Sequence, residues 1–197
     1  MTKKNLIFIH GFASSSKARK AEIIKKYLQK HSELNIEFNS LDFPDTPKEA
    51  FESIKNQIKS FQDAGDCIGV IGASMGGFFA MHLTQQLQFK ACLVNPCIDP
   101  WNLLPQFLGT FKNYYTGKEF TLDESSIQDV KNIKALPIDF AKLFVFLETA
   151  DEVLDYKVAK KFFDSHYETT KYIMKGGHHT FDYIEDFLPI MIKNLFE

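Results

Sequence analysis

Residues 67–78 read Cys-Ile-Gly-Val-Ile-Gly-Ala-Ser-Met-Gly-Gly-Phe and contain the pattern Gly-x-Ser-x-Gly, with the serine at position 74. A short apolar run precedes Ser74, and a segment of helical period follows it. The pattern predicts a strand, a sharp turn at the serine and then a helix. Such a turn projects the serine hydroxyl above the sheet. Gly72 and Gly76 keep side chains out of the space where strand and helix approach each other.

Five further apolar runs have the length of strands, and they alternate with segments of helical period. This alternation is typical of parallel βαβ units. We predict an α/β fold with a mostly parallel sheet of about six strands and helices on both faces, because nearly every run is too apolar to leave one face in water. The predicted strands are residues 5–9, 36–41, 67–71, 90–94, 142–147 and 170–174, and the predicted helices are 18–30, 48–61, 76–86, 156–165 and 181–196.

The stretch 96–139 interrupts this rhythm and is far longer than the usual connection after a strand. Its many aromatic residues, among them Trp101 and Phe107, argue against a disordered linker. We expect a single domain over residues 1–197, in which short helices and loops of this stretch form an insertion that caps one end of the sheet. A packing insertion without a role in substrate binding is an equal alternative.

The composition limits the partners and the compartment. A formal net charge of −2 gives no electrostatic reason to expect nucleic acid or an anionic membrane as a partner. No apolar run reaches the length of a membrane span, and the run at 6–9 is too short for a signal peptide. Cys67, Cys92 and Cys97 form neither an even disulfide set nor a metal-ligand spacing, and Cys67 and Cys92 are expected to be buried thiols. We expect a reduced, cytoplasmic, soluble protein without metal or cofactor.

A second loop is expected to contribute to the site around Ser74. The predicted strand at the N-terminus runs into His10-Gly11-Phe12, which is the usual layout of the first strand-to-helix loop in hydrolases with a Gly-x-Ser-x-Gly turn. In such enzymes this loop and the residue after the serine each supply one backbone N–H to a developing oxyanion. Phe12 and Met75 are therefore the candidate donors, and His10 is expected to brace the loop.

A serine hydroxyl is a weak nucleophile and needs a base, which a carboxylate orients. In this architecture the carboxylate and then the histidine follow the serine, each after a later strand. Asp151 follows the predicted strand 142–147, and His178 and His179 follow the strand 170–174. Chemistry alone does not separate the two histidines.

Two other aspartates compete for the role of the acid. Asp155 is more simply the N-cap of the helix that follows it, and Asp99 lies in the capping stretch. Spacing favours Asp151. The paired histidines do not suggest a metal site, because adjacent residues rarely reach one ion and no further ligand accompanies them at a suitable spacing.

On a set of motifs that run in order over nearly the whole chain, the sequence resembles the YqiA-like esterase family of bacteria, which are compact single-domain α/β-hydrolases. The matching segments are residues 10–12, 72–77, 94–96, 115–120, 151–156 and 176–181. The resemblance implies Asp151 as the acid, because the family's aspartate opens Asp-Glu-Val. It implies His179 as the base, because the family's histidine lies in Gly-Gly-x-His-x-Phe. Asp99 stands where the family tends to carry Arg, which argues against an anion-binding role at the mouth of the pocket, and Ala150 stands where Gly is expected.

These residues predict a serine hydrolase that cleaves small acyl esters or thioesters through an acyl-enzyme on Ser74, with His179 as base and Asp151 as its orienting acid. Two alternatives remain open at this point. A non-catalytic binding module can use the same scaffold, and an acyltransferase would pass the acyl group to an alcohol or amine instead of water.

Overall fold

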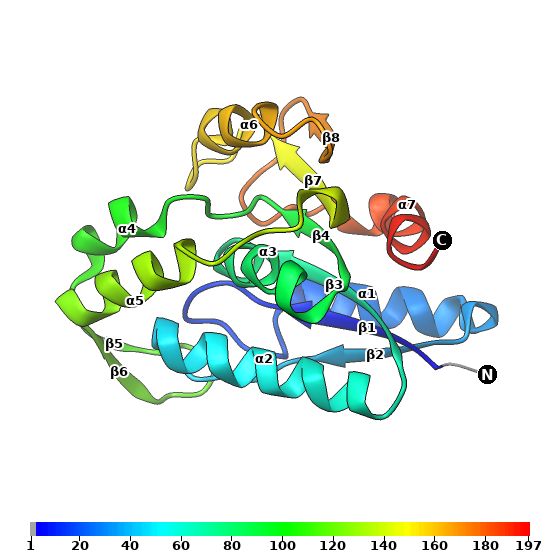
Figure 1. Ribbon diagram of the computed structural model, residues 1–197, viewed down its shortest axis with the longest axis horizontal. Helices are drawn as coiled ribbons and strands as arrows, with labels where there is room; N and C mark the ends of the chain where they lie inside the picture. Colours follow the sequence, from blue (N-terminus) through cyan, green and yellow to red (C-terminus); the bar gives the residue numbers. More distant parts are fainter. Residues whose placement is uncertain (1–2) are drawn as a thin grey trace.

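A computed structural model describes residues 3–197 and contains a six-stranded sheet in the order β2-β1-β3-β4-β7-β8 (Figure 1). Every neighbouring pair in this sheet is parallel. The α/β class and the parallel sheet are therefore confirmed. Its strands are β1 (Lys4–Ile9), β2 (Ile36–Ser40), β3 (Cys67–Ala73), β4 (Lys90–Val94), β7 (Leu143–Glu148) and β8 (Thr170–Met174).

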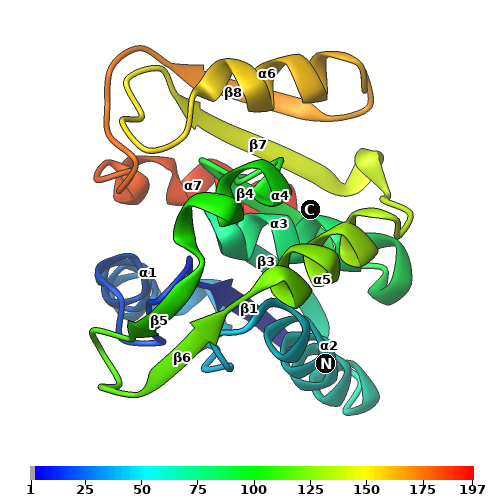
Figure 2. The ribbon, with the colours of Figure 1, turned by 90° about the vertical axis from the view of Figure 1, so that its left-hand side faces the viewer.

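Helices cover both faces of the sheet, as the apolar character of the strands predicts (Figures 1 and 2). One face carries α1 (Arg19–Lys30) and α7 (Ile184–Phe196), which also contact each other. The other face carries α2 (Pro47–Asp63), α3 (Met75–Leu87) and α6 (Tyr156–Asp164). Short 3-10 turns lie at Ser32–Leu34 and Phe140–Lys142.

The core consists of two apolar clusters, one on each face of the sheet. Side chains alternate between the faces along a strand, so Ile7 and Ile9 of β1 join the cluster under α2 and α3, whereas Leu6 and Phe8 join the cluster under α1 and α7. The central strands are buried on both sides, and the edge strands β2 and β8 are only partly buried.

Two expectations about single positions were wrong. Cys67 is exposed, not buried, because it is the first residue of β3 and the buried part of that strand begins at Ile68. The last helix begins at Ile184 instead of residue 181, because Phe181 has φ +49°, outside the helical region.

The stretch 96–139 folds at one end of the molecule, on the left in Figure 1. A two-stranded antiparallel hairpin stands there in addition to the expected short helices, and Figure 2 shows it between the α1 side and the α2 side. The sequence analysis did not predict this hairpin. The elements are α4 (Pro100–Leu103), the 3-10 turn Leu104–Phe107, β5 (Gly109–Lys112), β6 (Glu119–Leu122) and α5 (Glu124–Lys134).

Aromatic contacts attach the hairpin to the first loop. The ring centroids of Phe111 and Phe120 lie 5.9 Å apart on the two hairpin strands. Both rings contact Phe12, at centroid distances of 6.4 and 5.5 Å.

None of the helices within residues 3–197 is long and apolar enough to cross a membrane.

Candidate active site

Ser74 lies between the end of β3 and the start of α3, with φ +53° and ψ −120°. A non-glycine residue in this region is strained by about 1–3 kcal/mol. The turn leaves no room for side chains: a Cβ on Gly72 would stand 2.6 Å from the Gly76 carbonyl oxygen, and one on Gly76 would overlap the carbonyl oxygens of Ile9 and His10. The small residues that the sequence motif requires are thus explained by backbone contacts.

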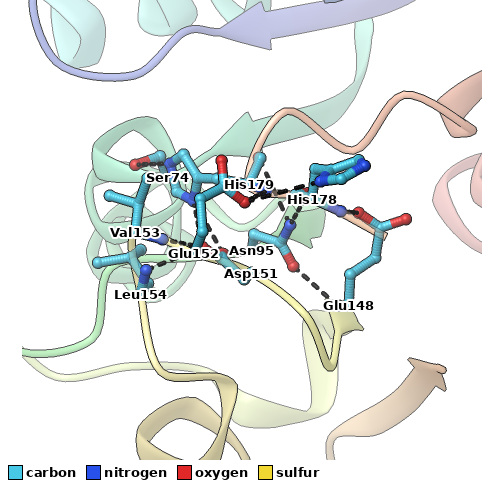
Figure 3. Close-up of polar contacts among 9 residues, drawn as sticks. All are labelled: Ser74, Asn95, Glu148, Asp151, Glu152, Val153, Leu154, His178 and His179. Carbon is cyan, nitrogen blue, oxygen red and sulfur yellow. Dashed lines mark hydrogen bonds and ion pairs between the residues drawn. The ribbon is translucent and has the colours of Figure 1, made fainter. Parts of the chain in front are cut away.

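Three of the predicted site residues form one hydrogen-bonded chain (Figure 3). The Nε2 atom of His179 lies 3.1 Å from the Ser74 Oγ, and its Nδ1 lies 2.8 and 3.0 Å from the two carboxylate oxygens of Asp151. The Asp151 side chain is 2% exposed and that of His179 is 19% exposed. Since Nδ1–H donates to a carboxylate in this arrangement, Nε2 is left free to accept a proton from the serine.

The carboxylate of Asp151 is held by backbone groups as well as by the histidine. Its Oδ1 accepts the N–H groups of Val153 (2.9 Å) and Leu154 (2.8 Å). Burial raises the pKa of Asp151, but the hydrogen bonds from His179 and from these N–H groups outweigh it, so the pKa lies below its usual value. The acid is therefore ionised at neutral pH.

The competing residues lie elsewhere. The His178 side chain is 68% exposed, and its Nδ1 lies 4.0 Å from a carboxylate oxygen of Glu152. Asp155 caps α6 by accepting the Lys157 N–H at 3.0 Å. Asp99 accepts a hydrogen bond from Asn102 at 3.0 Å. The structure brings Asp151 and His179 to Ser74 and leaves these three residues outside the chain of hydrogen bonds.

The two candidate oxyanion donors flank the serine. Met75 is the first residue of α3, where a helix N–H has no partner within the helix and where the helix dipole favours negative charge. Gly11, just before Phe12, lies against Ser74, since a Cβ there would be 3.2 Å from the serine Cβ. Neither the Phe12 nor the Met75 N–H donates a hydrogen bond to another backbone group within residues 3–197.

His10 lies buried within the first loop. It is 3% exposed, its Nδ1 lies 2.8 Å from the Gly11 carbonyl oxygen, and its ring stacks on Phe43 with centroids 4.1 Å apart. Burial lowers its pKa, which favours the neutral imidazole.

The structure adds two residues that the sequence analysis missed, Asn95 and Glu148, which hold the loop that carries His179 (Figure 3). Asn95 follows β4 with φ +39°. Its Nδ2 donates to the carbonyl oxygens of His178 (3.2 Å) and His179 (3.5 Å), and its Oδ1 accepts the Glu148 N–H at 2.9 Å. One amide side chain thus connects the end of β7 to the histidine loop.

The Glu148 carboxylate lies beneath the same loop. Glu148 is 2% exposed and accepts the His178 N–H at 2.9 Å. Gly177 passes over this carboxylate with φ +80°, and a Cβ at that position would overlap it. Burial raises the pKa of Glu148, and the His178 N–H opposes this shift. The sequence signals at these positions were the matched segment 94–96, which contains Asn95, and the lone polar residue Glu148 at the end of an apolar strand.

The remaining nucleophilic and metal-binding candidates do not form a second centre within the described chain. Cys97 is buried, and this burial raises its pKa to about 12, so the thiol is un-ionised. Among residues 3–197, no three His, Cys, Asp or Glu side chains gather in a group that could hold a metal ion.

The parallel sheet, the helices on both its faces and the strained turn at the serine form an α/β-hydrolase fold, and solved structures of other proteins share this fold. Similar solved structures include Est1E from Butyrivibrio proteoclasticus, at 15% identity and a TM-score of 0.72 over 98% of this chain and 86% of that one. The mouse alpha/beta hydrolase domain-containing protein 10 is 16% identical, with a TM-score of 0.71 over 96% of this chain and 88% of that one. An esterase of Pyrococcus furiosus is 16% identical, with a TM-score of 0.67 over 100% of this chain and 83% of that one. At these identities the likeness concerns the fold.

The family model described as Uncharacterised protein family (UPF0227) matches residues 5–196. The chain belongs to this family, which is the YqiA family that the sequence motifs indicated.

Proposed function

We propose that this protein is a serine hydrolase that cleaves carboxylic acyl esters or thioesters of small molecules. The observation that carries the proposal is the chain of hydrogen bonds from Asp151 through His179 to Ser74, on a serine held in a strained strand-to-helix turn. Solved structures of the same fold that are described as esterases support the class.

The first half of the reaction acylates the enzyme. His179 Nε2 takes the hydroxyl proton while Ser74 Oγ attacks the carbonyl carbon of the substrate. The negative charge moves to the carbonyl oxygen, which accepts hydrogen bonds from the Phe12 and Met75 N–H groups. His179 then gives its proton to the departing alcohol or thiol. The acyl group stays on the serine.

The second half returns the enzyme to its starting state. A water molecule takes the place of the leaving group, and His179 removes its proton as the water oxygen attacks the acyl carbon. The same two N–H groups hold the second oxyanion. When the intermediate collapses, Ser74 recovers its proton and the carboxylic acid leaves. Asp151 stays ionised throughout and stabilises the imidazolium.

The test is the turnover of p-nitrophenyl acetate by the wild type and by Ser74→Ala. Removing a catalytic serine of this kind lowers kcat by about 10⁴–10⁶-fold. Ser60→Ala changes an exposed serine of α2 and serves as the control, with activity expected at the wild-type level. Equal activity of Ser74→Ala and the wild type would overturn the proposal.

Product analysis separates hydrolysis from acyl transfer. With glycerol or a primary amine added as a competing acceptor, we expect free carboxylic acid as the main product. A dominant acylated acceptor would identify a transferase with the same nucleophile.

A further inference from the structure

Two hollows lie beside the first loop and the hairpin. The smaller, of about 160 Å³, is lined by residues that include Gly11, Ser14, Tyr115 and Thr180. The larger, of about 700 Å³, shares Ser14 and Tyr115 with it and lies between the first loop, the loop after β2 and the hairpin. The two hollows therefore adjoin each other at Ser14 and Tyr115.

The smaller hollow is lined by residues that neighbour the serine and the histidine, namely Gly11, Ala73 and Thr180. A Cβ on Gly11, one of its lining residues, would stand 3.7 Å from the Ser74 Oγ. Thr180, another lining residue, directly follows His179 in the chain. Because the histidine must protonate the leaving group, the alcohol part of an ester lies next to the histidine. The smaller hollow is therefore close enough to the reacting groups to receive the alcohol part of an ester.

One buried side chain fixes the walls of the larger hollow. Asn113 is 2% exposed, and its Nδ2 donates to the Ser14 carbonyl oxygen at 3.0 Å and to the Asp45 carboxylate at 2.7 Å. Its Oδ1 accepts the N–H groups of Tyr115 (2.9 Å) and Thr116 (3.0 Å). The hairpin turn is thus joined to both facing loops, and the hollow is held open as a formed site.

The lining of the larger hollow is rich in hydroxyl groups and carboxylates. Ser14, Ser15, Ser16, Thr46 and Thr116 contribute hydroxyls, and four carboxylates face two lysines, which leaves an excess of negative charge. The carboxylate of Asp45 is bonded to the neutral Asn113 amide, and that of Glu49 accepts the Thr46 hydroxyl at 2.5 Å. A negative lining of this kind repels an anionic ligand and offers acceptors to ligand hydroxyls.

The smaller hollow is lined by two cations, Arg19 and Lys20, and by one carboxylate, Asp182. Arg19 pairs with Asp182 at 3.4 Å. Burial lowers the pKa of Lys20, and the carboxylates of Asp182, Glu148 and Asp151 oppose this shift, so several carboxylates act on its ammonium group. Taken together, the two hollows are lined by five carboxylates and four cations, so an anionic leaving group finds no excess of positive charge over the whole site.

Tyr115 adds an aromatic surface where the hollows meet. Its side chain lines both of them and the residue is 53% exposed. An aromatic ring with a polar edge can pack against the C–H face of a sugar ring while neighbouring hydroxyls and carboxylates bond to the sugar hydroxyls.

We propose that these hollows bind the alcohol part of the substrate and that this part is a neutral, polyhydroxylated group such as a sugar. This inference rests on the proposed function, and it names the substrate class of that same site.

Three acetyl esters test it, because they keep the acyl part constant. They are p-nitrophenyl acetate as the reference, 3-O-acetylglucose as the neutral sugar ester, and 3-O-acetylglucuronate, which adds one carboxylate. We expect the wild type to have a higher kcat/KM on 3-O-acetylglucose than on 3-O-acetylglucuronate. Tyr115→Ala and Glu119→Gln should lower kcat/KM for 3-O-acetylglucose about tenfold, a larger fall than for p-nitrophenyl acetate, whose leaving group has no hydroxyls to bond. Tyr167→Ala, an 89% exposed tyrosine outside the hollows, is the matched control and should change neither.

The outcomes separate the two proposals. A wild type that turns over p-nitrophenyl acetate but prefers 3-O-acetylglucuronate, or turns over both sugar esters equally, would overturn the inference alone. So would an equal fall for both neutral substrates in Tyr115→Ala. A wild type without activity on p-nitrophenyl acetate would contradict the proposed function, and the inference would fall with it.

Discussion

At the scale of single residues, the central question is how a histidine on a loop is held against a serine on another element. Three contacts beneath residues 176–179 answer it: the Asn95 amide, the Glu148 carboxylate and the close passage of Gly177. Catalytic groups must stay within about 0.5 Å of their working positions. Loss of one of these contacts should therefore act on the chemical step.

Glu148 allows a matched pair of variants. Glu148→Gln keeps an oxygen that accepts the His178 N–H, whereas Glu148→Ala leaves that N–H without its acceptor. We expect Glu148→Ala to lower kcat about 10–100-fold with little change in KM, and Glu148→Gln to restore most of the rate. Steady-state kinetics on p-nitrophenyl acetate, with circular dichroism to verify folding, measure both. A folded Glu148→Ala with wild-type kcat would show that the carboxylate does not position the histidine.

The adjacent histidines form a second pair. His179→Ala removes the group bonded to Ser74 and Asp151, and a loss of about 10⁴-fold or more in kcat is expected. His178→Ala removes a side chain that is 68% exposed and should leave kcat close to that of the wild type. The reverse order of effects would refute the assignment of the base.

The sequence predicted the site residues whose role a motif marks, and missed two residues whose role depends on contacts between loops. Ser74 was marked by its glycines, and Asp151 and His179 by their place after strands. The residues themselves did not separate His179 from His178, and the family resemblance did. Asn95 lies in the matched segment 94–96 and Glu148 in none, and the sequence shows neither role, because both depend on two loops that only the folded sheet brings together.

At the scale of elements, the strands and helices of the sheet were predictable because each is an apolar run or an amphipathic segment of ordinary length. The hairpin was not predicted, since β5 and β6 have only four residues each. The available signal was the alternation of polar and apolar side chains at Thr110, Phe111 and Lys112, followed by a turn that contains Gly117.

Helix α3 contains a buried histidine that makes stability depend on pH. His82 is 2% exposed and packs against Phe78 at a centroid distance of 4.7 Å, and its Nδ1 has no hydrogen-bond partner within the described chain. Burial lowers its pKa from 6.5 to about 4, and the Leu136 carbonyl opposes the shift. Above pH 6.5 the group is neutral in both the folded and the unfolded state. Below that pH the unfolded state binds the proton first, so stability falls until the pH reaches about 4.

Between pH 7 and pH 5 this effect amounts to about 2 kcal/mol. Urea unfolding at the two pH values measures it, with His82→Gln as the comparison. The variant should lose about 2 kcal/mol less than the wild type over the same interval, whatever its stability at pH 7. An identical loss in both proteins would contradict the calculation.

At the scale of the whole molecule, we propose that the stretch 96–139 belongs to the same cooperative unit as the sheet. Trp101, the single tryptophan of the chain, lies in this stretch and reports on it. Its ring contacts Phe78 of α3, with centroids 6.4 Å apart, and the Lys134 ammonium lies 4.0 Å from its centroid. The insertion therefore packs on the helix that follows the serine.

Thermal unfolding followed by tryptophan fluorescence and by far-ultraviolet circular dichroism tests this proposal. We expect the two transitions to coincide, because the fluorescent residue and the sheet lose the same packing in one step. A fluorescence change at a clearly lower temperature would identify the insertion as a separately unfolding lid.

The claim on which the account depends is that Ser74 is an activated nucleophile, and covalent labelling tests it most directly. The protein is incubated with a fluorophosphonate, and the modified peptide is identified by mass spectrometry. We predict one phosphonyl group per chain on Ser74, and labelling slowed strongly in His179→Ala but not in His178→Ala. Complete absence of label on Ser74 in the folded wild type, or label on another residue, would contradict the account.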